Sequence, residues 1–251
     1  MATIYSANWE IKNVDAVFWD KDGTFINPDA YWGKLCELRI ENIIKHFNLP
    51  LNMYSDIAYV LGYDVTTKKL IPNGPVAILS RNEVIDILLN YLSEIKIETN
   101  YLEIDILFNQ VHNEFLTNAT SYTELLEGAK ECFEKMQKQG IKMAVITSDS
   151  YEHTTKTLIE LDIARYFNLV LGRDNCKGLK KTGEPAIKAL EILDISPKNV
   201  VVIGDAPMDY LMAENSDIKN VILTTTGHVP FDELRLMTPF VINSLTEISI
   251  K

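Results

Sequence analysis

Short apolar runs alternate with longer stretches of helical periodicity, and this alternation limits the folds that the chain can adopt. The apolar runs at residues 14–19, 142–146 and 200–203 each end in small or acidic residues, and residues 168–171 and 221–223 have the character of further strands. Helical periodicity covers residues 124–139, which stop at Gly140, and residues 151–162, 184–193 and 207–215. Alternating strands and helices predict a parallel sheet covered on both faces, with ligands bound at the carboxyl ends of its strands.

Residues 28–121 interrupt this alternation. Helical periodicity covers residues 31–47, 82–95 and 101–116, with a short helix expected at residues 54–61. Residues 62–75 (GYDVTTKKLIPNGP) are rich in turn formers and predict a loop or a small hairpin. We therefore expect a doubly wound, parallel-sheet α/β core domain made of residues 1–27 and 122–251, with an inserted and mostly helical domain at residues 28–121.

Composition restricts the partners. The net charge of −11 argues against a nucleic-acid partner, since phosphate backbones require clustered Lys and Arg. The same charge would repel a phosphorylated substrate, so a metal cation and a local lysine must supply positive charge at a phosphate site. Three widely separated cysteines predict reduced thiols in a cytoplasmic protein. The N-terminal residues lack signal-peptide features and no apolar run is long enough to span a bilayer, so we expect no membrane partner. The oligomeric state stays open.

Residues 20–24 (Asp-Lys-Asp-Gly-Thr) directly follow the first apolar run and carry two carboxylates that can take different roles. Asp20 can attack phosphorus once a metal has organised the site. Asp22 can protonate the leaving oxygen and later deprotonate the attacking water, and the Thr24 hydroxyl can tie the loop. Asp-x-Asp-Gly also occurs in ordinary turns and in calcium loops, but residues 25–28 (Phe-Ile-Asn-Pro) do not supply the acidic ligands of a calcium loop.

Two further elements suit a phosphoryl group. Thr147 and Ser148 follow the apolar run at residues 142–146, where hydroxyl groups and backbone amides can bind a phosphate oxygen. A simple helix N-cap is the alternative. Lys180 and Lys181 offer a cation that would offset charge on the nucleophile and in the transition state. A solvated loop charge is the alternative for both lysines.

The fourth element is the sequence Gly-Asp-Ala-Pro-Met-Asp at residues 204–209. Asp205 should lie at the tip of a strand, and Asp209 on the first turn of the next helix. One or two such carboxylates suffice for Mg²⁺, which prefers oxygen ligands and retains several waters. A helix cap beside an unrelated surface aspartate is the alternative.

Together these four elements, each at the tip of a separate predicted strand, resemble the haloacid dehalogenase-like (HAD) superfamily. Its phosphatases carry Asp-x-Asp-Gly-Thr, a strand-end Thr or Ser, a Lys, and Gly-Asp-x-x-x-Asp. The resemblance implies an HAD-like Rossmannoid core, bound Mg²⁺ and an aspartyl-phosphate intermediate. It makes Asp20 the nucleophile and a metal ligand, and Asp22 the acid/base whose backbone carbonyl also binds the metal.

The resemblance also assigns the remaining elements. Thr147 binds the phosphoryl group with help from Ser148, while Asp205 is a metal ligand and Asp209 supports the metal site. The family pattern around its lysine is Lys-Pro-x-Pro-x-Pro, from which this chain departs. Aligning residues 184–185 (Glu-Pro) with the end of that pattern places Lys180 at the lysine position and leaves Lys181 as the alternative.

The inserted residues 28–121 have the position and helical character of a family cap domain. Within them, residues 31–33 (Tyr-Trp-Gly) and 61–77 (LGYDVTTKKLIPNGPVA) are similar to the phosphoglycolate-phosphatase-like subgroup. The resemblance therefore implies a Mg²⁺-dependent phosphatase that acts on a small phosphorylated metabolite, such as one like phosphoglycolate. Candidates for contact with the leaving group are Tyr31, Trp32, Lys68, Lys69 and Arg81, although Tyr31 and Trp32 could equally be packing residues of the first inserted helix.

Other activities on the same core remain alternatives. Dehalogenation is disfavoured because the dehalogenases lack the second aspartate, here Asp22. A phosphosugar mutase shares all four elements. A phosphonoacetaldehyde hydrolase would need a lysine in the cap as Schiff-base former, and nothing singles one out. A non-catalytic binding module is disfavoured because four crowded carboxylates without a metal would cost stability.

Overall fold

The structure is a computed structural model that describes residues 2–72, 74–118 and 122–251. The chain divides into two compact units. One unit comprises Met1–Asn27 and Glu124–Lys251, and we call it the α/β unit. The other comprises Pro28–Thr123, and we call it the helical unit.

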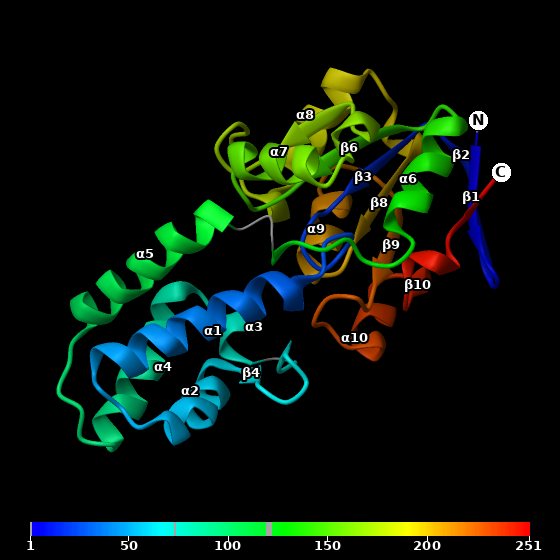
Figure 1. Cartoon of the computed structure of the whole chain (residues 1–251). Coiled ribbons are helices and arrows are strands. Elements are labelled where there is room, and N and C mark those ends of the chain that lie inside the picture. Colours follow the sequence, from blue (N-terminus) through cyan, green and yellow to red (C-terminus); the bar gives the residue numbers. More distant parts are fainter. Residues whose placement is uncertain (1, 73, 119–121) are drawn as a thin grey trace. The chain divides into compact units, whose positions relative to one another are not determined.

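A six-stranded sheet forms the centre of the α/β unit (Figure 1). Its strands are β3 (Ala16–Trp19), β6 (Lys142–Ile146), β7 (Leu169–Leu171), β8 (Val200–Gly204), β9 (Asn220–Thr224) and β10 (Val241–Ile242). Their order is β10-β9-β8-β3-β6-β7, and every neighbouring pair is parallel. The chain runs outward from β3 through β6 to β7 and then returns to β8 on the other side of β3. This reversal is a topological switch point at the carboxyl ends of β3 and β8, where open α/β sheets bind their ligands.

Helices cover both faces of this sheet. Val17 and Trp19 of β3 belong to the same buried cluster as Phe133 of α6 (Ala129–Lys138) and Leu158 of α7 (Tyr151–Glu160). The intervening Phe18 belongs to a second cluster, on the opposite face, with residues of three other helices. These are α8 (Glu184–Leu193), α9 (Pro207–Glu214) and α10 (Phe231–Arg235). Short 3-10 helices lie at Ala164–Tyr166, Lys180–Thr182, Pro197–Asn199 and Leu245–Glu247. The doubly wound α/β core is thus confirmed.

A second, antiparallel sheet in the α/β unit was not predicted from the sequence. It joins β1 (Ala2–Ser6) to β2 (Trp9–Val14) and to β11 (Ser249–Ile250), in the order β11-β1-β2. The predicted strand at residues 14–19 is therefore two elements, because Val14 ends β2 and β3 begins at Ala16. Asp15 between them bonds to other partners, donating its backbone N–H to the carbonyl oxygen of Asn199 at 2.8 Å.

The predicted helix at residues 124–139 is wrong at its start, because α6 begins only at Ala129. Gly128 adopts a left-handed conformation with φ of 84°, which ends the extended segment before it and prevents an earlier helical turn. Residues before it pair instead with the loop after β3. The N–H of Asn27 donates to the carbonyl oxygen of Glu124 at 2.8 Å, and the N–H of Leu126 donates to that of Phe25 at 2.9 Å.

The helical unit contains α1 (Pro28–His46), α2 (Tyr54–Leu61), α3 (Pro75–Ile78), α4 (Arg81–Glu94) and α5 (Tyr101–Asn118), with a 3-10 helix at Leu51–Met53. A hairpin of β4 (Tyr63–Asp64) and β5 (Lys69–Leu70) occupies the turn-rich segment. A capping box begins α4, since Glu83 accepts from the N–H of Ser80 at 2.8 Å and Ser80 Oγ from the N–H of Glu83 at 3.4 Å. The buried core of the helical unit is largely aliphatic, with Ile40, Leu88 and Phe108 fully enclosed. The inserted, mostly helical character of this segment is confirmed.

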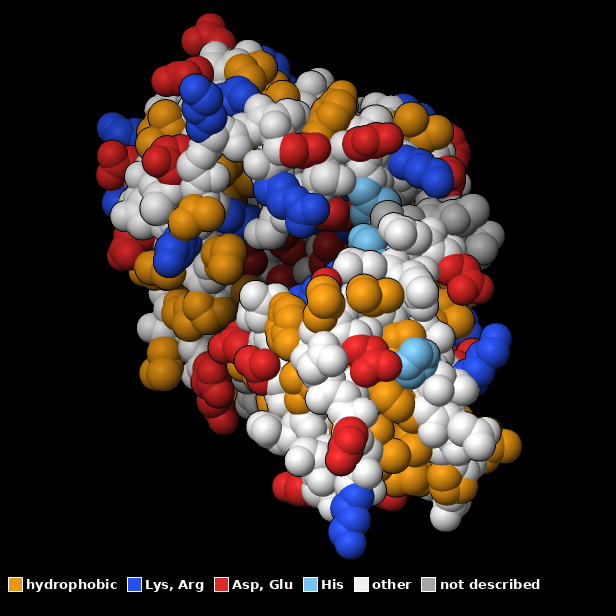
Figure 2. Space-filling model, turned by 90° about the vertical axis from the view of Figure 1, so that its left-hand side faces the viewer, with side chains coloured by type: hydrophobic (Ala, Val, Ile, Leu, Met, Phe, Trp, Pro, Cys, Tyr) orange, Lys and Arg blue, Asp and Glu red, His pale blue; other side chains and the backbone are white. Residues whose placement is uncertain are grey.

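Charged side chains of both signs are distributed over the surface. The face drawn in Figure 2 carries both acidic and basic side chains. Cys36, Cys132 and Cys176 are all buried and free. Among the described residues, none of the helices combines the length and apolar character needed to cross a bilayer.

Candidate active site

Asp20 lies at the first position after β3, and its surroundings fix its carboxylate. Its backbone N–H donates to the carbonyl oxygen of Ile203 in β8 at 2.9 Å. The residue is only 8% exposed, and the hydroxyl of Thr24 donates to its Oδ2 at 3.1 Å. The same hydroxyl lies 3.4 Å from Oδ1 of Asp205. Thr24 therefore ties the loop after β3, as its position in the motif suggests, and holds one oxygen of Asp20.

Lys180 meets the other oxygen of Asp20. Its Nζ contacts Asp20 Oδ1 and lies 2.6 Å from Oδ1 of Asp209. Burial alone would lower the pKa of Lys180, but the charges of Asp20 and Asp209 outweigh it and raise that pKa above its usual range. Lys181 is exposed, and its carbonyl oxygen accepts from Nδ2 of Asn215 at 2.9 Å. Of the two lysines proposed from the sequence, the structure brings Lys180 to Asp20.

Asp205 and Asp209 follow β8, as predicted, and have different surroundings. Asp209 is 1% exposed, and its Oδ2 accepts from the N–H groups of Asp205 at 3.2 Å and Ala206 at 3.1 Å. Asp209 thereby fixes the loop that carries Asp205, and its other oxygen pairs with Lys180. Gly204 makes this possible, because a Cβ atom there would collide with the Asp209 carboxylate. Asp209 is thus placed to support Asp205 from behind.

The three carboxylates form a group that suits a cation. Asp20, Asp205 and Asp209 each offer one oxygen atom, and these atoms lie within 4.8 Å of one another. Burial, together with the charges of Asp20 and Asp209, raises the pKa of Asp205 well above its usual range. Lys180 compensates only part of this negative charge. A hard divalent cation, which prefers oxygen ligands, would relieve the remaining repulsion, so the residues present fit a metal site.

Asp22 lies outside this group of carboxylates. Its Oδ1 accepts a hydrogen bond of 2.7 Å from Nζ of Lys21, and its side chain is 30% exposed. The backbone around it makes a tight turn, in which the carbonyl oxygen of Lys21 accepts from the N–H groups of Phe25 at 3.1 Å and Ile26 at 3.0 Å. Gly23 takes a φ of 82° within this turn. The motif thus directs its two carboxylates to different neighbours, as two different roles would require.

Thr147 and Ser148 lie at the carboxyl end of β6, the strand next to β3. The N–H of Thr147 donates to the carbonyl oxygen of Leu171 at 3.0 Å, and Thr147 Oγ1 accepts from the N–H of Asp149 at 3.1 Å. Thr147 is buried, whereas Ser148 is exposed, with its Oγ 4.0 Å from the sulfur of Met208. Neither Thr147 nor Ser148 is the N-cap of the next helix. Ser150 caps α7, because its hydroxyl oxygen accepts from the N–H of His153 at 3.2 Å.

Comparison with known proteins identifies the family. Residues 76–223, more than half of the chain, match the model of the haloacid dehalogenase-like hydrolases. The chain belongs to this family. The matched segment contains Thr147, Lys180, Asp205 and Asp209, whereas Asp20 precedes it.

Individual relatives extend the match over most of the chain. A phosphoglycolate phosphatase of Aquifex aeolicus is 25% identical over 206 residues, 82% of this chain and 83% of its own length. A pyrophosphatase PpaX of Bacillus cereus is 26% identical over 216 residues, 85% of this chain and 84% of its own length. An HAD-superfamily hydrolase of subfamily IA from Geobacter sulfurreducens shares the fold with a TM-score of 0.65, 16% identity, and coverage of 97% of both chains.

One residue of the candidate site escaped the sequence analysis. Gly227 follows β9, and a Cβ atom there would collide with the carboxylate of Asp205. The neighbouring Thr226 donates its hydroxyl to the carbonyl oxygen of Gly23 at 2.7 Å, which ties the loop after β9 to the loop after β3. A glycine in a turn carries no functional signal by itself, so only the three-dimensional contact reveals that Asp205 needs the space at residue 227.

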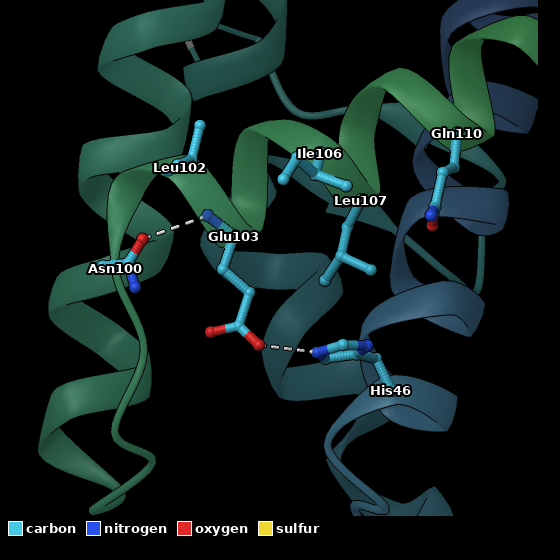
Figure 3. Close-up of a pocket in the computed structure, with 7 residues that line it drawn as sticks. All are labelled: His46, Asn100, Leu102, Glu103, Ile106, Leu107 and Gln110. Atoms are coloured by element: carbon cyan, nitrogen blue, oxygen red, sulfur yellow. Dashed lines mark hydrogen bonds and ion pairs between the residues drawn. The ribbon is translucent and has the colours of Figure 1, made fainter.

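A hollow of about 340 Å³ lies in the helical unit, between α1 and α5. Figure 3 shows the residues that line it. It is lined mainly by Leu102, Ile106 and Leu107, with His46 and Glu103 bonded to each other at 2.8 Å. Glu103 Oε2 accepts a second bond of 2.8 Å, from the hydroxyl of Thr99. The hollow contains none of the HAD motif residues, and both oxygens of its carboxylate already have protein partners.

Two residues suggested as leaving-group contacts are engaged inside the helical unit. Arg81 Nη2 forms an ion pair of 2.8 Å with Asp105 and donates to Asn109 at 2.8 Å. Tyr31 is 8% exposed and packs edge-on against Phe115, with ring centroids 4.8 Å apart. These contacts favour a structural role for both.

Proposed function

We propose that this HAD hydrolase is a Mg²⁺-dependent phosphatase that releases phosphate from a small phosphorylated metabolite through an aspartyl-phosphate on Asp20. The observation that carries the proposal is the setting of the Asp20 carboxylate. It is held by Thr24 and contacted by the ammonium group of Lys180, and it lies beside Asp205 and Asp209 in a group that fits a cation. A carboxylate fixed beside cationic groups at a sheet switch point is suited to attack a phosphoryl group.

The first step forms the phospho-enzyme. An oxygen of Asp20 bonds to phosphorus while the bond from phosphorus to the ester oxygen breaks. Asp22, in its protonated form, gives its proton to that ester oxygen, so the leaving group departs as a neutral alcohol. Asp22 suits this role because its carboxyl group does not belong to the metal-binding group and is partly exposed to solvent.

The second step regenerates Asp20. Asp22, now a carboxylate, takes a proton from a water molecule, and the water oxygen bonds to phosphorus as the bond to Asp20 breaks. Inorganic phosphate and the free Asp20 carboxylate result. Throughout, Lys180 offsets negative charge on Asp20 and the phosphoryl oxygens, while Thr147 offers a hydroxyl to one of those oxygens. Bound Mg²⁺, held by Asp20, Asp205 and the backbone carbonyl of Asp22, would neutralise phosphoryl charge and orient the substrate.

Relatives support the class of substrate. The named activities of the two curated relatives, a phosphoglycolate phosphatase and a pyrophosphatase, both remove phosphate from a small anionic molecule. The motif residues bind only the phosphoryl group and the metal, so they cannot distinguish one phosphate compound from another. We therefore propose that the helical unit serves as the cap and supplies the contacts that select the substrate.

Phosphate release tests this function. The purified protein is assayed for inorganic phosphate with an aryl phosphate, phosphoglycolate, pyrophosphate and hexose phosphates, each with Mg²⁺ and with excess chelator. We expect Mg²⁺-dependent release and the highest kcat/KM with a small metabolite. A protein that binds these compounds but releases no phosphate would be a binding module instead. Isomerised hexose phosphate without net phosphate release would identify a mutase.

A further inference from the structure

Lys21, the variable residue of Asp-Lys-Asp-Gly-Thr, has a buried charged side chain that the proposed mechanism does not use. The residue is 2% exposed. A lysine is almost never buried to this extent without partners. Here the partners are two carboxylates, because Nζ lies 2.7 Å from Asp22 Oδ1 and 3.3 Å from Asp149 Oδ2. The two contacts offset the cost of burying the ammonium group of Lys21.

Asp149 is fixed from several directions. Its Oδ2 also lies 2.5 Å from Nδ1 of His153 on α7, and its Oδ1 accepts from the N–H of Ser150 at 2.7 Å. Its own backbone N–H donates to Thr147 Oγ1 at 3.1 Å, and its carbonyl oxygen accepts from the N–H of Arg173 at 2.9 Å. Asp149 therefore belongs to the rigid loop between β6 and α7 and can serve as a firm anchor for Lys21.

Asp22, in contrast, has few restraints. Lys21 is the one side chain that hydrogen-bonds its carboxylate among residues 2–72, 74–118 and 122–251. Asp22 precedes Gly23, and its side chain is 30% exposed, so without this bond its carboxylate would be free to take other rotamers. Because Lys21 holds Oδ1, the second oxygen, Oδ2, is left to carry the proton.

We propose that Lys21, anchored by Asp149 and His153, is a positioning residue that orients the carboxyl group of Asp22 for proton transfer. The inference rests on the proposed phosphatase function and adds to it a network that links the loop after β6 to the acid/base group. The competing explanation is a purely structural tie between the loops after β3 and β6, and the two differ in how activity depends on the leaving group.

A misplaced general acid lowers kcat/KM more for some substrates than for others. An alkyl phosphate has a basic leaving oxygen that must receive a proton as its bond to phosphorus breaks, whereas nitrophenolate leaves readily as an anion. Lys21→Met should therefore lower kcat/KM for an alkyl phosphate at least ~10-fold more than for p-nitrophenyl phosphate, as general acid catalysis contributes roughly 10²–10⁴-fold. A structural tie alone would lower both values equally.

The matched control is Lys142→Met, which removes another lysine tie in the α/β unit. Lys142 begins β6, and its Nζ donates to the carbonyl oxygen of Leu193 at 2.8 Å, at the amino ends of the strands and away from the motif loops. In Lys142→Met the ratio of kcat/KM for p-nitrophenyl phosphate to kcat/KM for the alkyl phosphate, the leaving-group ratio, should match that of wild type. Asp149→Asn keeps Lys21 and weakens its anchor, so it should shift the ratio in the same direction as Lys21→Met but less far. If Lys21→Met does not fold, Asp149→Asn is the deciding variant.

If Lys21→Met folds and its leaving-group ratio is unchanged, the positioning role is overturned. If Lys21→Met does not fold, an unchanged ratio in Asp149→Asn overturns it. Failure of the proposed function is distinguishable, because wild type would then release no phosphate from either ester. Circular dichroism and thermal unfolding of each variant establish that the compared proteins are folded.

Discussion

Lys180 and Asp209 form a buried ion pair, with 2.6 Å between Nζ and Oδ1, and the same ammonium group contacts Asp20, the proposed nucleophile. Lys180→Met should remove the cation from the nucleophile and lower kcat/KM by roughly 10²–10³-fold. It should also destabilise the fold by about 3–5 kcal/mol, because it leaves buried carboxylates without a counter-charge. Steady-state kinetics and denaturant unfolding measure the two effects. Lys181→Met is the matched control, since Lys181 is exposed, and it should keep nearly full activity. Equal losses in the two variants would contradict the placement of the lysine.

Asp20→Asn should abolish turnover, with a loss of at least ~10³-fold, because an amide keeps the shape of the side chain but is not a nucleophile. The fold should remain intact, since the change removes one charge from a repulsive group of carboxylates. Phosphate release and thermal unfolding measure these outcomes. Substantial phosphatase activity in a pure preparation of Asp20→Asn would show that the covalent mechanism is wrong.

Mg²⁺ should be required for activity and should raise the melting temperature of the wild-type protein, because a cation relieves repulsion among Asp20, Asp205 and Asp209. Calcium should inhibit, since it accepts more oxygen ligands and could engage both oxygens of Asp20. Thermal unfolding and phosphate-release assays, each with Mg²⁺ and with calcium, test these expectations. Asp205→Asn should lose the shift in melting temperature. Full activity after exhaustive chelation would rule out the metal requirement.

Gly227→Ala should lower activity by roughly 10–100-fold, the range typical when the groups that hold a metal-binding side chain in place are disturbed. The added Cβ atom has no space beside the carboxylate of Asp205, which must move. The Mg²⁺ concentration that gives half-maximal activity should rise in parallel. Gly140→Ala provides a control, because a Cβ atom there has no neighbour within 4 Å. It should cost about 1 kcal/mol through its φ of 73° and leave the metal dependence unchanged.

Stability in acid should depend on Asp149. Burial alone would raise the pKa of Asp149, but the bond to His153 and the charge of Lys21 hold it well below its usual range. A depressed carboxyl pKa stabilises the fold above the unfolded pKa of about 3.9, and this contribution is lost as the pH falls further.

Asp149→Asn should therefore lose about 1.5–3 kcal/mol of unfolding free energy near neutral pH, the range of a hydrogen bond to a charged group. Its deficit relative to wild type should shrink between roughly pH 4 and pH 2. Urea unfolding at a series of pH values measures both. Asp217→Asn is the control, because the Asp217 side chain is 88% exposed and the change should have little effect at any pH. A deficit that stayed constant with pH would exclude the charge of Asp149 as its cause.

The sequence predicted the strand-end positions of the motif residues because the physical signal is local. An apolar run followed at once by polar residues marks the tip of a buried strand, and parallel strands bring their carboxyl tips to one edge. The strand at Lys142–Ile146 and the helix at Glu184–Leu193 have the predicted bounds. The alignment of residues 184–185 with the family pattern favoured Lys180 over Lys181, and Lys180 is the one whose Nζ contacts Asp20. Local sequence signals alone did not separate the two lysines, since adjacent residues of a short 3-10 helix point in different directions.

Features that depend on distant pairing were missed. The N-terminal hairpin is short and polar on one face, and its first strand pairs with Ser249–Ile250 at the other end of the chain. Lys21 occupies a variable position of its motif, and its role becomes visible only once Asp149 is seen beside it. The space that Asp205 needs at Gly227 likewise depends on two loops that are remote in sequence.

The helical unit leaves and rejoins the α/β unit at neighbouring points of the backbone, since the N–H of Asn27 bonds to the carbonyl oxygen of Glu124 at 2.8 Å. A bridge of a few residues would close this gap at small entropic cost, because the ends are already together. The ladder from β3 to β6 depends on none of the inserted residues. The insertion is therefore modular: a chain shortened between Asn27 and Glu124 should still assemble the sheet. Exchange of the insert between relatives would then test the proposal that it selects the substrate, without redesign of the fold.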